Sequence, residues 1–503
     1  MSDGDQIVVV GVAQHTWREH DVQRTPVDAL ETVCAEALAD AGTVALRGAI
    51  DALVHVPFVS DNFEGLVDAM PRNPGVRVAE RLGLVARQYR GDVGGNLPQY
   101  LVTEFAARLR RRECEAVMIM GVELLATFRA SLRAGEGFPP WSSGVETPAE
   151  CVTRTPAMTS DTELAHGLFE PSHSYSLFES SLRHATGVSA AEQGERLGAM
   201  IARMSEVAAR NPHAARREAL TAARVQSPEA GNRMIAFPYT KLMCAHLGVD
   251  QAAAVIITTA AKARALGIDS ERWVYLRGAA DCNDLWFLSE RPTLHQSMAL
   301  RIAAAEAQRQ AQLTLDEIDL FDIYSCFPSA LAVACDALGL SPDDPRGLSV
   351  TGGMSLFGGP GNNYSLHAIG SLVERLRATR DGCGMVTANG GYLTKHSVGV
   401  YSRTPGGSAP EPRPRSELQR EVDGQRRLPV ITRAEGAVTL DAHTVRFGRE
   451  GPKGAIVLAR NGAGERCLAV SEAPEVLEAL LSTDCVGMSG YVENKEGLNY
   501  LRF

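Results

Sequence analysis

The sequence lacks the cysteine pairs from which zinc sites and redox motifs are built. It has ten cysteines among 503 residues. No two of them stand in a CxxC pair, and none lies near histidines at the spacing of a zinc site. We therefore expect neither a metal site nor a bound cofactor.

Long apolar runs and an N-terminal targeting signal are also absent. No stretch approaches 18 uninterrupted apolar residues, which excludes a transmembrane helix. Residues 1–5 are acidic and lead directly into a strand-like run, unlike the basic start of a signal peptide. A cytoplasmic location is the simplest expectation.

An excess of positive charge is missing as well. The formal net charge is -10, which argues against a nucleic acid or an anionic membrane as the main partner. A local basic patch can still bind one anionic ligand. The length, together with 45% hydrophobic and 22% charged residues, predicts two to four globular domains.

Strand and helix patterns alternate along most of the chain. Thr25 suits the cap of a helix and Pro26 its first turn. Strand-like runs occupy residues 6–12, 52–56, 116–121, 252–258, 273–276, 320–323 and 384–388, and helical patterns occupy 25–42 and 98–112. This alternation predicts an α/β layered domain with a largely parallel sheet, and the pattern occurs twice.

Two segments depart from the alternation. Residues 125–235 combine Pro-, Ser- and Gly-rich loops with helices and show no obvious strand, which indicates an insertion over the sheet. Residues 404–427 have the composition of a linker. Beyond it, short strands at 436–440, 444–447, 454–459, 467–470, 490–492 and 498–501 and a helix at 474–481 predict a small, OB-like β-barrel. The expected units are thus 1–249, 250–403 and 428–503.

Several ordered segments resemble the thiolase family. They are residues 113–123, ending in a Gly-x-Glu turn, residues 250–255, residues 314–322, and the Tyr-Ser-Cys-Phe loop at 324–327, with 175–178 and 211–214 in the insertion. The last three are most similar to the sterol-carrier-protein thiolase branch. The resemblance implies a thiolase fold, a duplicated five-layer α-β-α-β-α arrangement with an inserted loop domain.

The residues that thiolases use for chemistry are replaced. Thiolase chemistry needs a cysteine nucleophile, a histidine that activates it, a second cysteine that moves a proton, and an oxyanion hole. The resemblance places the nucleophile at Gly95 and the activating histidine at Gly359. It places the second cysteine at Ala388 and the polar residue of the third loop at Tyr324. No catalytic residue is therefore expected at these positions.

What remains suits binding. The ligand-binding candidates are Gly94, Gly95 and Asn96 at a helix start, Tyr324 and Cys326 in the third loop, Gly358, Gly359, Asn363 and His367, and Asn389 and Gly390. A helix N-terminus and glycine turns can hold an oxyanion or a phosphate oxygen. Each feature also has a structural interpretation: a tight turn for the glycines, a buried cysteine, a packing histidine. Lys395 and His396 can meet an anion or form a solvated loop.

Three functions remain open. The leading hypothesis is a degenerate thiolase-like protein that binds CoA or an acyl-CoA in lipid or sterol metabolism without thiolase chemistry. The second is an acetyl-CoA acetyltransferase-like acyltransferase with relocated residues, for which Cys326, His367 and His396 are candidates. The third is an interaction or scaffold protein that docks a protein partner through its C-terminal barrel.

Overall fold

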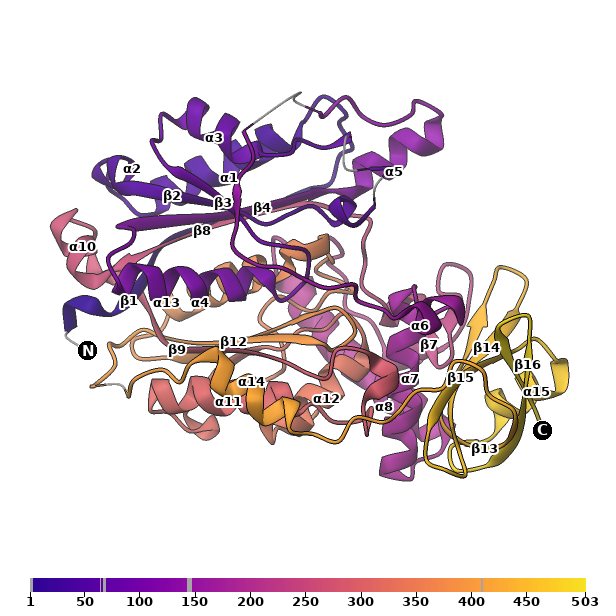
Figure 1. Cartoon of the computed structure of the whole chain (residues 1–503). Coiled ribbons are helices and arrows are strands. Elements are labelled where there is room, and N and C mark those ends of the chain that lie inside the picture. Colours follow the sequence, from indigo (N-terminus) through magenta and orange to yellow (C-terminus); the bar gives the residue numbers. More distant parts are fainter. Residues whose placement is uncertain (1–2, 64, 67–68, 143–146, 409) are drawn as a thin grey trace.

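The α/β core has five layers. The computed structural model describes residues 3–63, 65–66, 69–142, 147–408 and 410–503. Helices α1–α3 cover one sheet, α4 and α13 lie between the two sheets, and α11 and α12 cover the other face of the second sheet (Figure 1). The core helices are α1 (Pro26–Asp40), α2 (Ala45–Ala49), α3 (Pro74–Leu82), α4 (Leu97–Arg110), α10 (Ala260–Ala265), α11 (Met298–Ala311), α12 (Pro328–Leu338) and α13 (Tyr364–Arg377). The predicted thiolase fold is confirmed.

The strands of both layers form one hydrogen-bonded series in the order β10-β11-β12-β9-β1-β8-β4-β2-β3-β5. Their bounds are β1 (Ile7–Trp17), β2 (Ile50–His55), β3 (Arg87–Arg90), β4 (Ala116–Leu124), β5 (Glu150–Cys151), β8 (Asp250–Thr259), β9 (Val274–Asn283), β10 (Leu320–Asp322), β11 (Cys383–Gly390) and β12 (Lys395–Ser402). Only Ile7 to Val9 of β1 pair with β9, and this short contact joins the two layers.

The sheet is mixed, so the expectation of a largely parallel sheet is wrong. Strand β8 runs antiparallel to both β1 and β4, and β12 runs antiparallel to β9 and β11. The misinterpretation has a physical cause. Strands β1, β4 and β8 are buried along most of their length, so they carry the continuous apolar runs that are typical of parallel sheets.

Local sequence explains where α1 begins. The Thr25 side chain accepts a hydrogen bond from the Asp28 N–H, and the Asp28 carboxylate accepts one from the Thr25 N–H. This reciprocal capping, with Pro26 in the first turn, fixes the helix start where the sequence predicted it.

The insertion carries helices α5 (Leu125–Ala134), α6 (Asp161–Ala165), α7 (Pro171–Thr186), α8 (Ala190–Arg210) and α9 (Ala222–Gln226). It ends in a short hairpin of β6 (Met234–Ala236) and β7 (Tyr239–Thr240). That hairpin pairs with the C-terminal domain, where Ala236 lies opposite Arg446. The expectation that residues 125–235 contain no strand is therefore wrong at two places, at β5, which pairs with β3, and at β6.

The C-terminal domain is a closed barrel of five strands. They are β13 (Gly436–Phe447), β14 (Pro452–Asn461), β15 (Arg466–Ser471), β16 (Ser489–Lys495) and β17 (Leu498–Arg502), with α15 (Pro474–Ser482) between β15 and β16. The pairing runs β13-β14-β15-β17-β16 and back to β13, with β15 and β17 parallel. The OB-like barrel is confirmed. The two strands expected at 436–440 and 444–447 are one strand with an irregularity at Asp441.

The segment with linker composition contains a packed helix, α14 (Arg415–Asp423). Leu418 and Val422 are buried, and α14 lies along β9. The Arg415 guanidinium donates to Asp281 at 2.9 Å and covers the Tyr100 ring. Residues 415–423 are thus part of the core surface rather than an extended connection.

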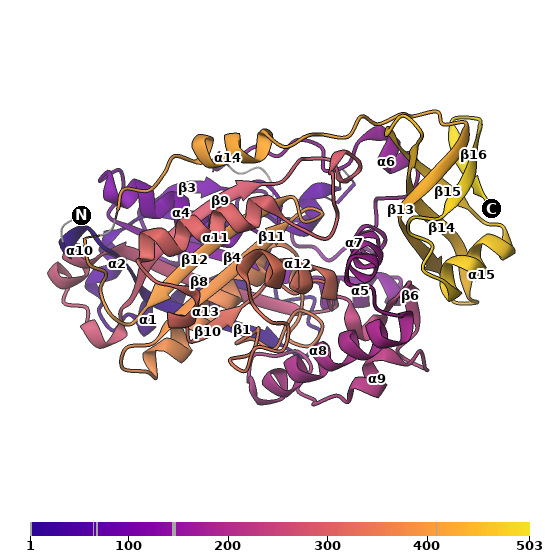
Figure 2. The same ribbon diagram turned by 90° about the horizontal axis from the view of Figure 1, so that it is seen from below.

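The barrel sits at one end of the molecule, beyond α7 (Figure 2). The Arg466 guanidinium, almost fully buried, donates to the Arg291 carbonyl at 2.6 Å and pairs with Asp441 at 3.0 Å. The His443 N–H donates to the Ser180 hydroxyl of α7 at 3.0 Å. The bonds to Arg291 and Ser180 dock the barrel on the core, whereas the Arg466–Asp441 pair lies within the barrel.

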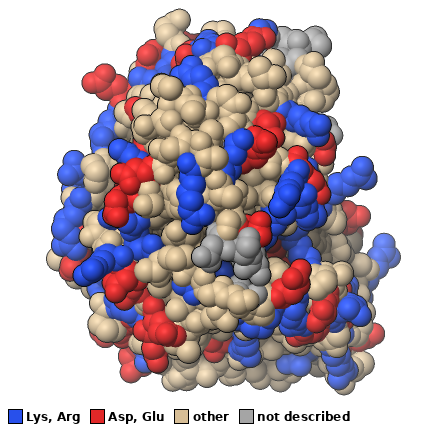
Figure 3. All heavy atoms as spheres, turned by 90° about the vertical axis from the view of Figure 1, so that its left-hand side faces the viewer, with Lys and Arg blue, Asp and Glu red and all other residues tan. Residues whose placement is uncertain are grey.

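The surface at the opposite end carries basic and acidic side chains side by side, with no large area of one sign (Figure 3). This face has no polyanion-binding character. Among the described residues, no helix is long and apolar enough to cross a bilayer.

Candidate functional site

The space over Gly95 is filled by Tyr324. Gly95 lies just before α4, and Tyr324 lies between β10 and α12. A Cβ added to Gly95 would lie 1.9 Å from the Tyr324 hydroxyl and 2.6 Å from the Asn389 carbonyl oxygen. The position that the resemblance assigns to the nucleophile therefore has neither a side chain nor room for one.

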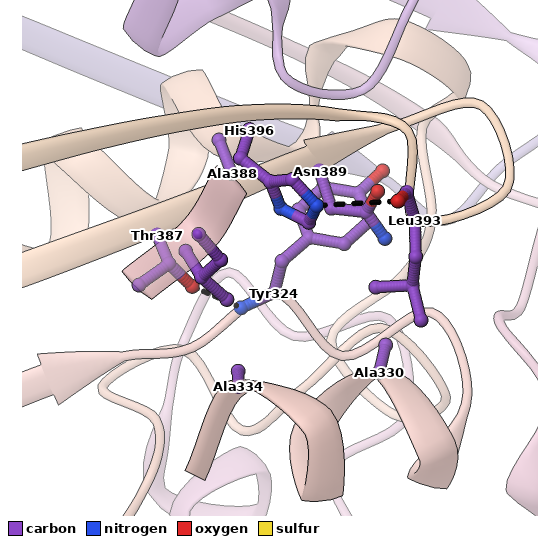
Figure 4. Close-up of a pocket in the computed structure, with 9 residues that line it drawn as sticks. Tyr324, Ala330, Ala334, Thr387, Ala388, Asn389, Leu393 and His396 are labelled. Atoms are coloured by element: carbon purple, nitrogen blue, oxygen red, sulfur yellow. Dashed lines mark hydrogen bonds between the residues drawn. The ribbon is translucent and has the colours of Figure 1, made fainter. Parts of the chain in front are cut away.

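Residues of the second half surround a small cavity. Tyr324, Ala388 and Asn389 line it together with His396 from β12 and Ala330 and Ala334 from α12 (Figure 4). Its volume is about 10 Å³, which accommodates about one water molecule. The Asn389 amide donates to the Tyr175 hydroxyl at 2.8 Å. The centre is closed and packed, and no acyl chain fits inside it in this conformation.

The relocated residues of the acyltransferase hypothesis are not assembled into a catalytic group. Burial raises the pKa of the Cys326 thiol to about 12, which disfavours the thiolate. The His367 ring contacts the side chains of Gln14 and Asn363, and burial lowers its pKa to about 3. His367 packs in the core, and Cys326 has no histidine among its hydrogen-bond partners in the described chain.

Lys395 and His396 lie on β12, and both are buried. The alternative of a solvated loop is therefore wrong. His396 Nε2 lies 3.2 Å from the Ser297 hydroxyl and 3.3 Å from Asp284. Ser297 also caps α11, so this Ser-His-Asp group holds a helix start and is closed to solvent.

The Gly358 to Asn363 loop is held by backbone contacts. The Gly359 N–H donates to the His246 carbonyl at 2.9 Å, and a Cβ on Gly359 would lie 3.2 Å from the Ala245 Cβ. Gly358 has a φ of 124°, which favours glycine. The Asn363 amide donates to the Gly121 carbonyl. Gly358 and Asn363 are thus structural in this conformation, whereas Gly359 adjoins a more exposed region.

That region carries a group of basic side chains, which we call the basic cluster: Arg129, Arg216, Lys241 and His246. Burial, together with the positive charges of Arg216, Lys241 and Arg129, lowers the pKa of His246 to about 4, so its ring is neutral near pH 7. In the described chain, none of these three cations forms a salt bridge with a carboxylate. The cluster therefore has a positive potential beside Gly359, which the charge of Glu218 near Arg216 offsets only in part.

Sequence reasoning missed the basic cluster because its members come from α5, from the segment after α8 and from the end of the insertion. No local pattern joins them. Lysine is rare in this sequence, since only five of the 50 Lys and Arg residues are lysines. This rarity is the one sequence signal that could have singled out Lys395. Gly94, Asn96 and Gly390 do lie together around Lys395.

The five layers and the loops that meet at Gly95 and Tyr324 define a thiolase-fold protein. Solved structures below 25% identity agree on the fold. The Ltp2-ChsH2(DUF35) aldolase is 17% identical, with 80% of this chain and 98% of that chain covered and a TM-score of 0.59. Human mitochondrial 3-ketoacyl-CoA thiolase is 15% identical, with 79% and 98% covered and a TM-score of 0.55. Acetyl-CoA acetyltransferase from Syntrophomonas wolfei is 14% identical, with 79% and 99% covered and a TM-score of 0.54.

The chain belongs to the family of SCP2-thiolase-like proteins type 1. It is 31% identical to the monomeric member from Mycobacterium smegmatis, with 100% of both chains covered and a TM-score of 0.85. Residues 417–497 match the model of the thiolase-like protein type 1 additional C-terminal domain. No curated protein matches the sequence.

Proposed function

We propose that this protein binds CoA or an acyl-CoA beside Gly359 without carrying out thiolase chemistry, as a carrier or partner subunit in lipid or sterol metabolism. The observation that carries the proposal is the basic cluster. CoA bears a diphosphate and a further phosphate, and guanidinium groups pair with phosphate oxygens through two parallel hydrogen bonds. Two arginines and a lysine without salt bridges in the described chain, beside the neutral ring of His246, suit such a ligand.

The closed centre supports the non-catalytic part of the proposal. Tyr324 covers Gly95, and burial raises the pKa of the Tyr324 hydroxyl well above its usual value, with Cys326 adding to the shift. The hydroxyl therefore stays protonated and is a poor base. We expect purified protein to leave acetoacetyl-CoA uncleaved in the presence of CoA.

Calorimetry tests the proposal. We expect CoA to bind with a dissociation constant in the micromolar range, about -8 kcal/mol, and pantetheine, which lacks the phosphates, to bind at least tenfold more weakly. The double variant Arg129→Gln/Arg216→Gln should also lose at least tenfold. The matched control Arg433→Gln/Arg449→Gln removes two exposed charges from the barrel and should bind like the wild type.

Two results would count against the proposal. If CoA at millimolar concentration gives neither heat nor a rise in melting temperature, CoA binding is excluded and an interaction protein becomes the better hypothesis. If both double variants bind CoA equally well, the basic cluster is not the phosphate site.

A further inference from the structure

Lys395 is set apart from the other lysines of this chain. The sequence has only five, at 241, 262, 395, 453 and 495. Lys262 and Lys495 form salt bridges with glutamates, and Lys241 and Lys453 are exposed. Lys395 alone among them is buried, with 8% of its surface exposed.

Within the described chain, the hydrogen bonds of the Lys395 amine go to neutral oxygens. It donates to the Val93 carbonyl and, at 3.1 Å, to the Thr155 hydroxyl. Asp92 lies near enough to act on it through charge but forms no salt bridge with it. Burial lowers the pKa of Lys395 to about 8, and Asp92 offsets only part of the effect. Near neutral pH an appreciable fraction of this amine is therefore uncharged and nucleophilic.

Two glycines of the former reacting centre make room for this side chain. A Cβ on Gly94 would lie 2.6 Å from Lys395 Nζ, and a Cβ on Gly390 would lie 3.0 Å from Lys395 Cε. The side-chain amide oxygen of Asn96 (Oδ1), buried and without a hydrogen-bond partner in the described chain, faces the same space. The amine thus lies beside the start of α4, against Gly94 and Asn96.

We propose that the Lys395 amine is an acyl acceptor, which takes the acyl group of an activated acyl compound and holds it as an amide. An acyl thioester is the donor class that the proposed function supplies, so this inference rests in part on that function. The amine nitrogen attacks the thioester carbonyl carbon and forms the C–N bond. The C–S bond then breaks, and the leaving thiolate takes up the proton that the amine loses. No oxidant or reductant is needed.

Access requires movement of the residues that cover the amine. Thr155 accepts its hydrogen bond, and the Thr155 N–H is held by the Asp92 carboxylate at 2.7 Å. Met158 packs against Gly391 on the same side. These residues are at least partly exposed, so the cover consists of a short surface segment rather than core. A small acyl donor is the appropriate probe.

The experiment compares the five lysines within one molecule. Full-length protein is treated with limiting p-nitrophenyl acetate, an acyl donor without CoA, or with acetyl-CoA, and acetylation is followed by peptide mass spectrometry. We expect p-nitrophenyl acetate to modify Lys395 at least tenfold faster than Lys241 and Lys453. Lys395→Arg should remove that adduct and leave the labelling of the other four lysines unchanged.

The two acyl donors test two claims separately: that the Lys395 amine is reactive, and that a thioester is its acyl donor. If p-nitrophenyl acetate modifies Lys395 no faster than Lys241 and Lys453, the acyl-acceptor proposal is overturned, and this comparison needs no variant. Fast labelling by p-nitrophenyl acetate without labelling by acetyl-CoA would support the reactive amine and exclude the thioester as its donor. Labelling by both donors supports the complete proposal.

Discussion

Gly95 and Tyr324 are complementary in shape. A glycine before α4 leaves a gap, and the phenol ring enters it from the loop after β10. The sequence alone identified both positions as substituted, because each lies in a segment that resembles the thiolases. It could not show that one substitution fills the space left by the other, since 229 positions separate them in the chain. The sequence also left open whether Lys395 is buried or exposed, because its burial depends on contacts with Gly94, which is distant in the chain, and with Gly390.

This complementarity predicts that Gly95→Ala destabilises the protein. The methyl group would overlap Tyr324 and the Asn389 carbonyl, and overpacking of this kind costs about 1–3 kcal/mol. Adding Tyr324→Ala should recover part of the loss, which urea denaturation of the single and double variants would measure. Gly48→Ala, in α2 and with no heavy atom near the added methyl, should be neutral or stabilising. Equal losses for Gly95→Ala with and without Tyr324 would contradict this account.

At the scale of elements, the sequence predicted the strongly apolar strands and the capped helices. It did not predict which strands pair with each other or whether they run parallel or antiparallel. Strand β12 is fully buried. Because it follows the glycine turn at 390–391 and begins with Lys395 and His396, its sequence is also typical of a polar loop. Helix α14 was not predicted because the surrounding segment is rich in Pro, Arg and Glu, a composition that is typical of a linker. Its apolar content is little more than Leu418 and Val422, four positions apart, and tertiary packing rather than composition stabilises it.

The packing of α14 predicts where a protease will cut. Trypsin should cleave first after Arg426 or Arg427, which are exposed beyond the helix, and only later after Arg415 or Arg420 within it. Leu418→Ala should free the helix and make Arg415 and Arg420 early sites, whereas Ser416→Ala, on the exposed side, should keep the wild-type order. Peptide mapping over time measures this. Early cleavage at Arg420 in the wild type would show that α14 is not held on β9.

For the molecule as a whole, buried neutral histidines couple stability to pH. Burial lowers the pKa of His55, His367 and His443 to about 3 each. Between pH 6.5 and about 3 the unfolded chain therefore binds more protons than the folded one. The stability that these groups contribute is complete above pH 6.5 and is lost as the pH falls.

We accordingly expect these three histidines to lower the free energy of unfolding, measured with urea, as the pH falls from 7 to 5, against the opposite effect of Glu123, whose pKa burial raises to about 8. Both ring nitrogens of His55 lack a hydrogen-bond partner within the described chain, and its ring packs near Phe58. His55→Phe should remove one titrating group and flatten the dependence by up to about 1.4 kcal/mol per pH unit. An unchanged slope in this variant would mean that His55 is charged in the folded protein.

The hairpin of β6 and β7 also sets an order for the synthesis of the protein. Phe237 and Thr444, which share a hydrogen bond across the two domains, are 207 residues apart. At about 5–20 residues per second, the ribosome delivers the second partner about 10–40 s after the first. During that time the edge of the hairpin that pairs with β13 has no partner strand. Unpaired strand edges promote non-native association between chains. A chain truncated before the barrel would keep that edge without β13, so the barrel also covers an edge that would otherwise favour aggregation.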